Sequence, residues 1–163
     1  MAASLRRLLA LPAVAALAML GTSAEGSTRT GKLTVQATVS SACALDTATM
    51  DFGTYYSGAA VNRDAAGSIG YIKCYNTALT LELDLGQNAS GSTRNMKSGA
   101  SLLRYELYQD SARTKVLSTG SNAMALTSDA TGAATVPIYG RIPMGQVVSP
   151  GDYSDVVGIV LTF

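Results

Sequence analysis

Two segments of the chain carry apolar residues at every second position. The apolar positions are Leu33, Val35, Ala37 and Val39 in residues 32–39, and Val157, Ile159, Leu161 and Phe163 in residues 153–163. A period of two residues is typical of a β-strand that buries one face. The sequence therefore predicts an N-terminal arm and a C-terminal strand. It leaves open whether the arm pairs with its own domain or with a neighbouring molecule.

The residues between these two segments also favour short strands separated by turns. Strands are predicted at 43–45, 69–75, 79–85, 102–109, 115–118, 124–127 and 134–142, whereas the polar stretches 57–67 and 87–101 are predicted to be loops. Pro137 indicates an edge or a bulge in its strand, because proline cannot donate a backbone hydrogen bond. No segment after residue 24 has a persuasive helical period. This pattern favours an all-β sandwich.

The first residues have the features of an export signal. Arg6 and Arg7 precede an apolar run at 8–20, and small residues follow at 21–24, an order typical of a cleaved signal peptide. The run is shorter than the roughly 20 apolar residues that a membrane span needs. We therefore expect a signal peptide at 1–24, with cleavage after Ala24.

Charge and cysteine content narrow the function further. Two of the 12 Lys and Arg residues lie in the signal, so the remainder carries 10 against 11 Asp and Glu, a formal charge of −1. That balance gives no indication of nucleic acid or anionic lipid as a partner. Cys43 and Cys74 are the only cysteines, and an even number in an exported chain predicts a disulfide.

Catalytic and metal-binding chemistry is poorly represented. The chain contains no His, which excludes Ser–His and Cys–His nucleophilic catalysis and leaves two cysteines unable to complete a zinc site without carboxylates. Glu82 and Asp84 are the most catalytic-looking pair, but charged residues on a strand are mostly a solvated face. We therefore expect no catalytic residues, no metal, no cofactor and no enzymatic activity.

Several sequence blocks, taken in their order along the chain, carry a resemblance to a known family. They are residues 31–39 running into Cys43, then 51–53, Cys74, 103–113, 136–143 and 151–163. Together these blocks resemble the spore coat protein U domain family, which supplies the pilin subunits of archaic chaperone–usher pili. The resemblance covers nearly all of the chain after the signal.

The resemblance implies a fold and a mode of assembly. The expected fold is an immunoglobulin-like β-sandwich that lacks its last strand and is completed by donor-strand complementation. Residues 25–41 would then be a donor-strand arm and 42–163 the pilin domain. Leu33, Val35, Ala37 and Val39 would fill a neighbour's groove, and Val157, Ile159, Leu161 and Phe163 would pair with a chaperone or a neighbouring subunit.

The resemblance also implies partners and a location. The expected partners are a periplasmic pilus chaperone, an outer-membrane usher and copies of the same or related pilins, with no nucleic acid. The subunit would be exported through the periplasm to a surface pilus that supports adhesion and biofilm formation. Two alternatives stay open: a spore or cell-surface coat protein of the same family, and a monomeric secreted carbohydrate-binding β-sandwich whose arm completes its own domain.

Overall fold

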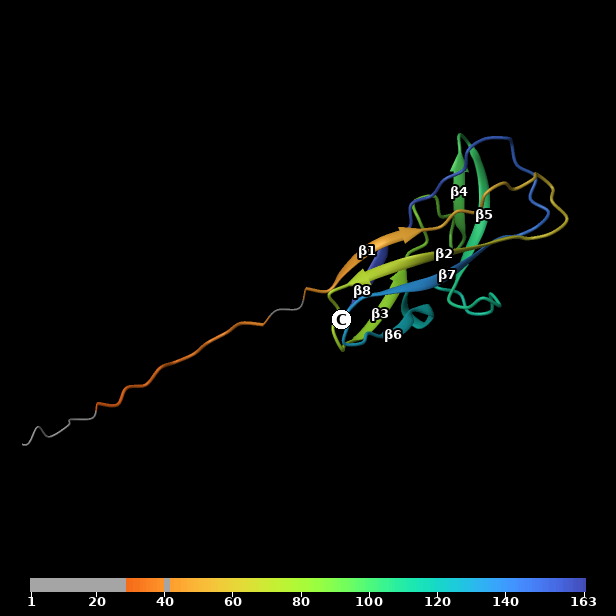
Figure 1. The fold of residues 1–163 in the computed structure, drawn as a ribbon. Coiled ribbons are helices and arrows are strands. Elements are labelled where there is room, and N and C mark those ends of the chain that lie inside the picture. Colours follow the sequence, from red (N-terminus) through yellow and green to blue (C-terminus); the bar gives the residue numbers. More distant parts are fainter. Residues whose placement is uncertain (1–28, 40–41) are drawn as a thin grey trace, which may run out of the picture. The chain divides into compact units, whose positions relative to one another are not determined.

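The computed structural model describes residues 29–39 and 42–163 (Figure 1), so the expected signal peptide at 1–24 lies outside the described residues. The chain divides into two units, with the boundary between Thr38 and Val39. Residues 29–38 form neither helix nor strand. Within the described ranges, no helix is long and apolar enough to cross a membrane.

The second unit is built from two antiparallel sheets. The larger sheet has the spatial order β1-β2-β7-β5-β4, and the smaller has the order β6-β3-β8. The strands of the larger sheet are β1 (Ala44–Thr49), β2 (Arg63–Ile72), β7 (Ala134–Ile142), β5 (Ser101–Tyr108) and β4 (Arg94–Ser98). Those of the smaller sheet are β6 (Met124–Thr127), β3 (Ala78–Leu83) and β8 (Ile159–Thr162), and a short 3-10 helix, η1 (Gly120–Asn122), precedes β6.

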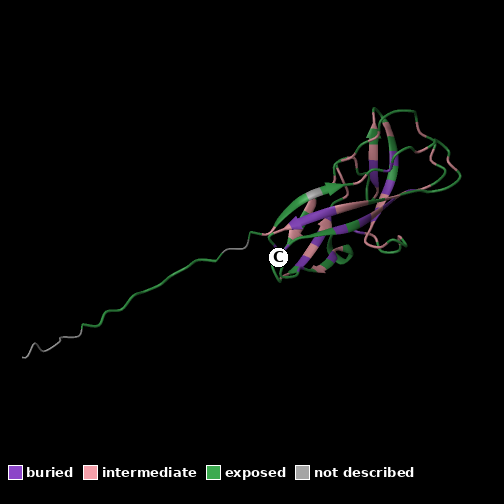
Figure 2. Ribbon diagram, viewed as in Figure 1, coloured by how far each residue is buried: buried purple, intermediate pink, exposed green. Residues whose placement is uncertain are grey.

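Both sheets contribute to one apolar core. The buried residues include Leu79, Leu81 and Leu83 from β3, Leu103, Tyr105 and Leu107 from β5, and Ile69, Tyr71, Val136, Ile138 and Ile142 from β2 and β7. Figure 2 shows buried positions alternating with intermediate or exposed positions along β3, β5 and β7. Such alternation places every second side chain between the sheets. The prediction of an all-β, immunoglobulin-like sandwich is confirmed.

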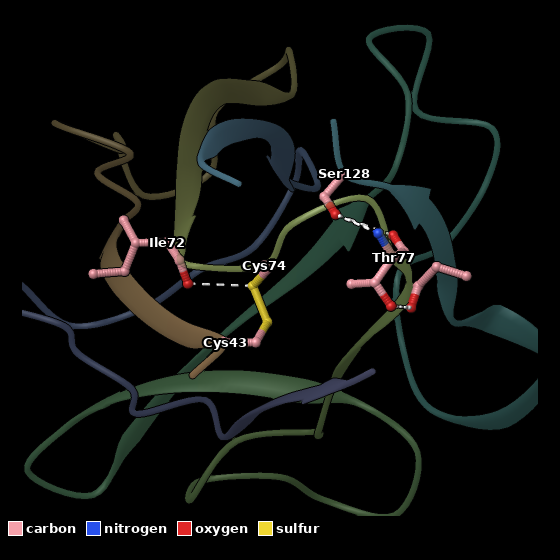
Figure 3. The surroundings of a disulfide bond; sticks show 6 residues. Cys43, Ile72, Cys74, Thr77 and Ser128 are labelled. Atoms are coloured by element: carbon pink, nitrogen blue, oxygen red, sulfur yellow. Dashed lines mark hydrogen bonds between the residues drawn. A yellow bond between two sulfur atoms is a disulfide. The ribbon is translucent and has the colours of Figure 1, made fainter. Parts of the chain in front are cut away.

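The predicted disulfide between Cys43 and Cys74 is present (Figure 3). Cys43 directly precedes β1 and Cys74 follows the end of β2, and their Cα atoms are 4.3 Å apart. Because Ala44 pairs with Ile72, the bond closes the end of the β1–β2 ladder. It thereby fixes an edge strand that has only one hydrogen-bonded neighbour.

Two predicted loops contain strands. β4 lies within the stretch 87–101, and β2 begins at Arg63 within the stretch 57–67. The prediction failed for β4 because its buried positions are Arg94 and Asn95, which give no apolar signal. In β2, Arg63–Ser68 are small or polar residues and are exposed or only partly buried.

The C-terminal strand is shorter than predicted. β8 covers only Ile159–Thr162, because its partner β3 ends at Leu83, which pairs with Ile159. The preceding residues 153–158 are held by an isolated bridge to β4 and by loop hydrogen bonds. The predicted strand at 115–118 is likewise reduced to one bridge, between Tyr108 and Val116.

Pro137 lies where the sequence predicted an edge. β7 pairs with β2 along its whole length, but β5 pairs only with Tyr139, Gly140 and Arg141. Among the described residues, Pro137 therefore has a strand neighbour on one side only. A missing N–H group is tolerated at such a position.

Candidate functional site: an open groove beside β8

A groove with a volume of about 430 Å³ exposes the core between the edge strand β1 and residues 153–159. Side chains from both sheets form its floor: Phe52, Ile69, Leu83, Met96, Tyr105, Leu107 and Ile138. Ala48, Thr49 and Met50 form one rim, and residues 153–157 with Ile159 form the other. One rim belongs to β1, an edge strand of the larger sheet, and the other leads into β8, an edge strand of the smaller sheet. The open groove therefore marks the place where the sandwich is not closed.

The rim formed by residues 153–159 has the side-chain pattern of a strand. Its odd-numbered residues, Tyr153, Asp155, Val157 and Ile159, are partly buried, whereas the even-numbered residues between them are exposed. This is the pattern expected for an extended segment with one face against the core. Every second side chain of the rim is therefore available to contact whatever fills the groove.

The backbone of the same rim has one open edge. On one side, Ser154 exchanges hydrogen bonds with Lys97, and the carbonyl groups of Val156 and Gly158 accept hydrogen bonds from Gln87 and Asp84. The N–H and C=O groups of Tyr153, Asp155 and Val157 make no hydrogen bond within the part of the chain that the structure describes. Successive residues of a strand direct these groups to opposite edges, so the rim presents a free edge to an incoming strand.

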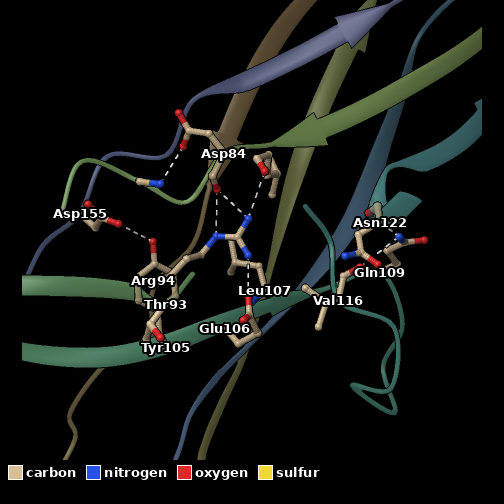
Figure 4. A network of polar contacts seen from close by, with 12 residues as sticks. Asp84, Thr93, Arg94, Tyr105, Glu106, Leu107, Gln109, Val116, Asn122 and Asp155 are labelled. Atoms are coloured by element: carbon tan, nitrogen blue, oxygen red, sulfur yellow. Dashed lines mark hydrogen bonds and ion pairs between the residues drawn. The ribbon is translucent and has the colours of Figure 1, made fainter. Parts of the chain in front are cut away.

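Asp155 anchors this rim to the core. Its Oδ2 accepts a 2.7 Å hydrogen bond from the Tyr105 hydroxyl (Figure 4). Its Oδ1 accepts hydrogen bonds from the backbone and side chain of Asn88 at 3.1 and 3.0 Å. Burial, reinforced by the bond to Asp155, raises the pKa of Tyr105 above its usual value. The Tyr105 hydroxyl therefore stays protonated and remains a donor.

Gly86 is required beside this contact. Its φ angle is +82°, and a Cβ atom there would collide with the carboxylate of Asp155. Only glycine adopts this conformation without strain and leaves room for the side chain. The turn after β3 is therefore shaped around the anchor of the rim.

Arg94 joins the two sheets beneath the rim. Its side chain is fully buried, and its guanidinium donates hydrogen bonds to the carbonyl groups of Leu83 and Asp84 at the end of β3. It also forms an ion pair with Glu106 of β5 at 2.5 Å. Figure 4 shows these contacts converging on one guanidinium. The network ties the end of the small sheet to the large sheet.

The two carboxylates that the sequence singled out also have structural partners. Oδ1 of Asp84 accepts hydrogen bonds from the backbone of Gly86 and Gly158, each at 2.8 Å. Oε1 of Glu82 accepts a 2.7 Å hydrogen bond from the backbone of Gly120. Asp84 therefore holds the turn after β3 against the residue that precedes β8.

A second hollow, of about 660 Å³, continues from the open groove. It lies between residues 50–57 and 148–153 and shares Met50, Phe52, Met96 and Tyr153 with the groove. Its lining includes Asp51 and Asp152, so it is more polar. The apolar part of the site is therefore the part next to Val157 and Ile159.

The predicted pairing residues divide into two groups. Val157 and Ile159 line the open groove, whereas Leu161 and Phe163 lie beyond its lining. Leu161 is partly buried against the core, and Phe163 follows β8 and is 55% exposed. Pairing of this segment with a chaperone or a neighbour stays a prediction.

The predicted donor residues lie in the extended segment 29–39. The side chains of Leu33, Val35 and Val39 are 88%, 82% and 94% exposed, and Ala37 is exposed as well. Monomeric proteins rarely expose a continuous row of large apolar side chains. Their role as a donor strand stays a prediction.

Sequence reasoning missed the residues that shape the groove. Tyr153 and Asp155 are odd-numbered positions of the predicted strand 153–163, but the apolar pattern marks only the four residues from Val157 onward as pairing positions. Tyr105 and Arg94 gave no such signal, because their partners are far away in the sequence. Among the described residues, no group of three or more His, Cys, Asp and Glu side chains is placed to hold a metal ion.

The fold and the open groove define an all-β domain of the incomplete-sandwich class. The sequence profile of the Spore Coat Protein U domain matches residues 29–160. Protein U of Myxococcus xanthus is 32% identical, in an alignment that covers 86% of this chain and 88% of that protein. The chain belongs to the Spore Coat Protein U domain family.

A solved structure shares the fold. It is a chain of the CsuC–CsuE chaperone–tip adhesion subunit pre-assembly complex from the archaic chaperone–usher Csu pili of Acinetobacter baumannii. The TM-score is 0.55 at 22% sequence identity, over 74% of this chain. The chain spans 39% of the length of that relative.

Proposed function

We propose that the chain is a structural subunit of a surface pilus whose subunits are joined by donor-strand exchange. The observation that carries this proposal is the open groove with its free backbone edge at Tyr153, Asp155 and Val157. The exposed apolar side chains of residues 33–39 form a segment that can fill the apolar groove. A strand that adds to a free sheet edge gains both backbone hydrogen bonds and side-chain pockets.

The energy of such a contact is sufficient for a stable filament. Burial of Leu33, Val35 and Val39 contributes about 1.5–3 kcal/mol for each side chain. A ladder of backbone hydrogen bonds adds about 0.5–1.5 kcal/mol net for each bond. Since the arm belongs to one molecule and the groove to the next, repetition of this contact produces a polymer.

Assembly of this kind requires dedicated assembly proteins, because an open groove with a free strand edge promotes aggregation. We propose that a periplasmic chaperone first fills the groove and that an outer-membrane usher exchanges it for the arm of the next subunit. The finished filament is then exported to the cell surface, where it supports adhesion and biofilm formation. In this scheme residues 25–41 are the donor arm and 42–163 are the pilin domain.

Deletion and grafting of the arm test this function. A variant that lacks residues 29–39 should still fold on its chaperone but should not polymerise. A second variant carries the same residues after Phe163 through a short flexible linker, so that pairing becomes intramolecular. It should be a monomer with a raised melting temperature, as measured by light scattering and calorimetry.

The opposite outcome would favour another class of protein. If the deleted form unfolds even with its chaperone and the grafted form gains no stability, the arm belongs to its own domain. The chain would then be a monomeric secreted binding module. Val35→Asp is a matched check, because it would bury an unpaired carboxylate in the groove at a cost of several kcal/mol and should also stop polymerisation.

A coat protein is the second candidate, and the match to the Spore Coat Protein U domain and to Protein U favours it. Such a protein can use the same groove and arm but form a layer in place of a filament. Immunogold electron microscopy of intact cells distinguishes the two. Label along thin filaments supports the pilus, and label confined to the surface of a cell or spore supports the coat.

A further inference from the structure

The arm and the groove rim carry matching series of four positions. In the arm, Leu33, Val35 and Val39 are large, whereas Ala37 is small. In the rim, the four odd-numbered residues from 153 to 159 face the groove, and Asp155 is the charged one. Each series therefore contains one position that differs from the rest. It is the third position of the arm, Ala37, and the second position of the rim, Asp155.

This order defines a direction and a register. If the arm runs antiparallel to the rim with Leu33 opposite Ile159, the remaining pairs are Val35 with Val157, Ala37 with Asp155, and Val39 with Tyr153. A parallel arm that fills the same four positions would place Val35 opposite Asp155. All strand pairs of the two sheets are antiparallel.

We propose that the arm of a second copy enters the open groove antiparallel to β8, with Ala37 against the hydrogen-bonded pair of Asp155 and Tyr105. The inference rests on the proposed function and specifies its partner contact. Ala37 is then the register-determining residue of the arm. Among the four arm positions, Ala37 is the one at which a large side chain would fit worst.

The physical reason is the polarity of that position in the groove. Both carboxylate oxygens of Asp155 already accept hydrogen bonds, from Tyr105 and Asn88. A large apolar side chain pressed against this group would remove its remaining contact with water or displace one of its donors. Either change has a cost that a methyl group avoids.

The same register agrees with two further features. Gly31, two residues before Leu33, lies opposite Leu161, which is beyond the lining of the groove, so no side chain is needed there. The backbone groups of Asp155 are on the free edge, so Ala37 and Asp155 form a hydrogen-bonded pair. Thr38 and Ser154 then form a non-hydrogen-bonded pair, in which Cα atoms are closest.

Cysteine cross-linking of the full chain tests the direction. The antiparallel register places Thr38 opposite Ser154, whereas the parallel register places Thr34 there. Two double variants, Thr38→Cys with Ser154→Cys and Thr34→Cys with Ser154→Cys, share one site and differ only in the arm. Non-hydrogen-bonded antiparallel pairs meet the Cα distance that a disulfide requires.

The expected result is a ladder of covalent oligomers on a non-reducing gel for the Thr38 variant only. Each single cysteine variant is the control for exchange with the native disulfide. A ladder for the Thr34 variant only, or for neither variant while both still polymerise, overturns the register but leaves donor-strand exchange intact. Failure of the wild-type chain to polymerise at all is a failure of the proposed function itself.

Side-chain size in the arm tests the role of Ala37. In assembled polymers, Ala37→Leu should speed subunit release in denaturant at least tenfold, whereas the matched Val35→Leu should leave it unchanged or slow it. In an Ala37→Leu, Asp155→Ala double variant the loss should be smaller than the sum of the single effects, because contacting residues couple. Slower release of Ala37→Leu subunits would place Ala37 in an apolar part of the groove and overturn the register.

Discussion

The hydroxyl of Tyr105 donates a 2.7 Å hydrogen bond to Oδ2 of Asp155, which joins a core side chain of β5 to the rim of the open groove. Asn88 holds the other carboxylate oxygen. The rim therefore keeps its place through contacts within the domain, without a strand in the groove. A preformed edge lowers the entropy that an incoming strand must lose on binding.

Tyr105→Phe should loosen this rim. The change leaves an oxygen of Asp155 without its donor, at a cost of about 1–3 kcal/mol. Hydrogen exchange should accelerate at residues 154–158 and remain unchanged in β6, while the melting temperature falls. Tyr108→Phe, on the same strand, is the control. Unaltered exchange at 154–158 would mean that Asn88 alone holds Asp155.

Arg94→Met should be one of the most destabilising single changes in the domain. It leaves Glu106 unpaired and removes the donors for the carbonyl groups of Leu83 and Asp84, with an expected loss of about 3–5 kcal/mol in the free energy of unfolding. Arg94→Lys should restore little, because an ammonium cannot reproduce the planar fork of donors. Denaturant titration measures both effects, and Arg104→Met, at an exposed position of β5, is the matched control.

Local patterns allowed much of the fold to be predicted. The bounds of β6 and β7 agree with the sequence, and β3 and β5 differ by one or two residues at their ends. In β3, β5 and β7 the residues of the buried face recur at every second position, so this face can be recognised from the sequence. The apolar pattern at 153–163 likewise indicated an edge that faces the core.

The remaining features depend on contacts between distant residues. Arg94 is buried in β4 because carbonyl groups ten and eleven residues away accept its hydrogen bonds, and no local pattern reports this. The groove floor combines side chains from Phe52 to Ile138, so its shape follows from the topology of both sheets. The arm could be recognised as apolar and alternating, but its binding partner could not.

Loss of the disulfide should destabilise the domain. Cys43→Ala with Cys74→Ala removes a cross-link between residues 31 positions apart, worth about 3–4 kcal/mol in the chain-entropy model. The yield of subunit in the periplasm should fall accordingly. Chemical denaturation of the purified variant gives the free energy of unfolding. Thiol titration of the unfolded native protein should find no free thiol, and two free thiols would contradict the structure.

The ion pair between Asp64 and Arg141 should add acid sensitivity. The two side chains make hydrogen bonds of 2.7 and 2.9 Å, and this contact with Arg141 lowers the pKa of Asp64 below the usual 3.8. Because the pKa is lower in the folded state, the stabilisation is present above about pH 4 and is lost as the pH falls through the folded value. Asp64→Asn should therefore cost about 0.5 kcal/mol at neutral pH, since the pair is partly exposed. Its stability should converge with that of the native chain as the pH falls below the folded-state pKa of Asp64.

Removal of residues 161–163 should abolish chaperone capture. Leu161 and Thr162 pair with Leu81 and Thr80 of β3, so the deletion removes half of β8 and uncovers the edge of β3. The rim at 153–157 then loses the strand that continues it, and an incoming strand loses its register. The truncated subunit should be degraded in the periplasm and should not co-purify with its chaperone. Deletion of Phe163 alone leaves every strand pair of β8 in place, so comparing it with the longer truncation separates the contribution of this terminal residue from that of the strand. Normal assembly of the longer truncation would show that the C-terminal segment takes no part in strand pairing.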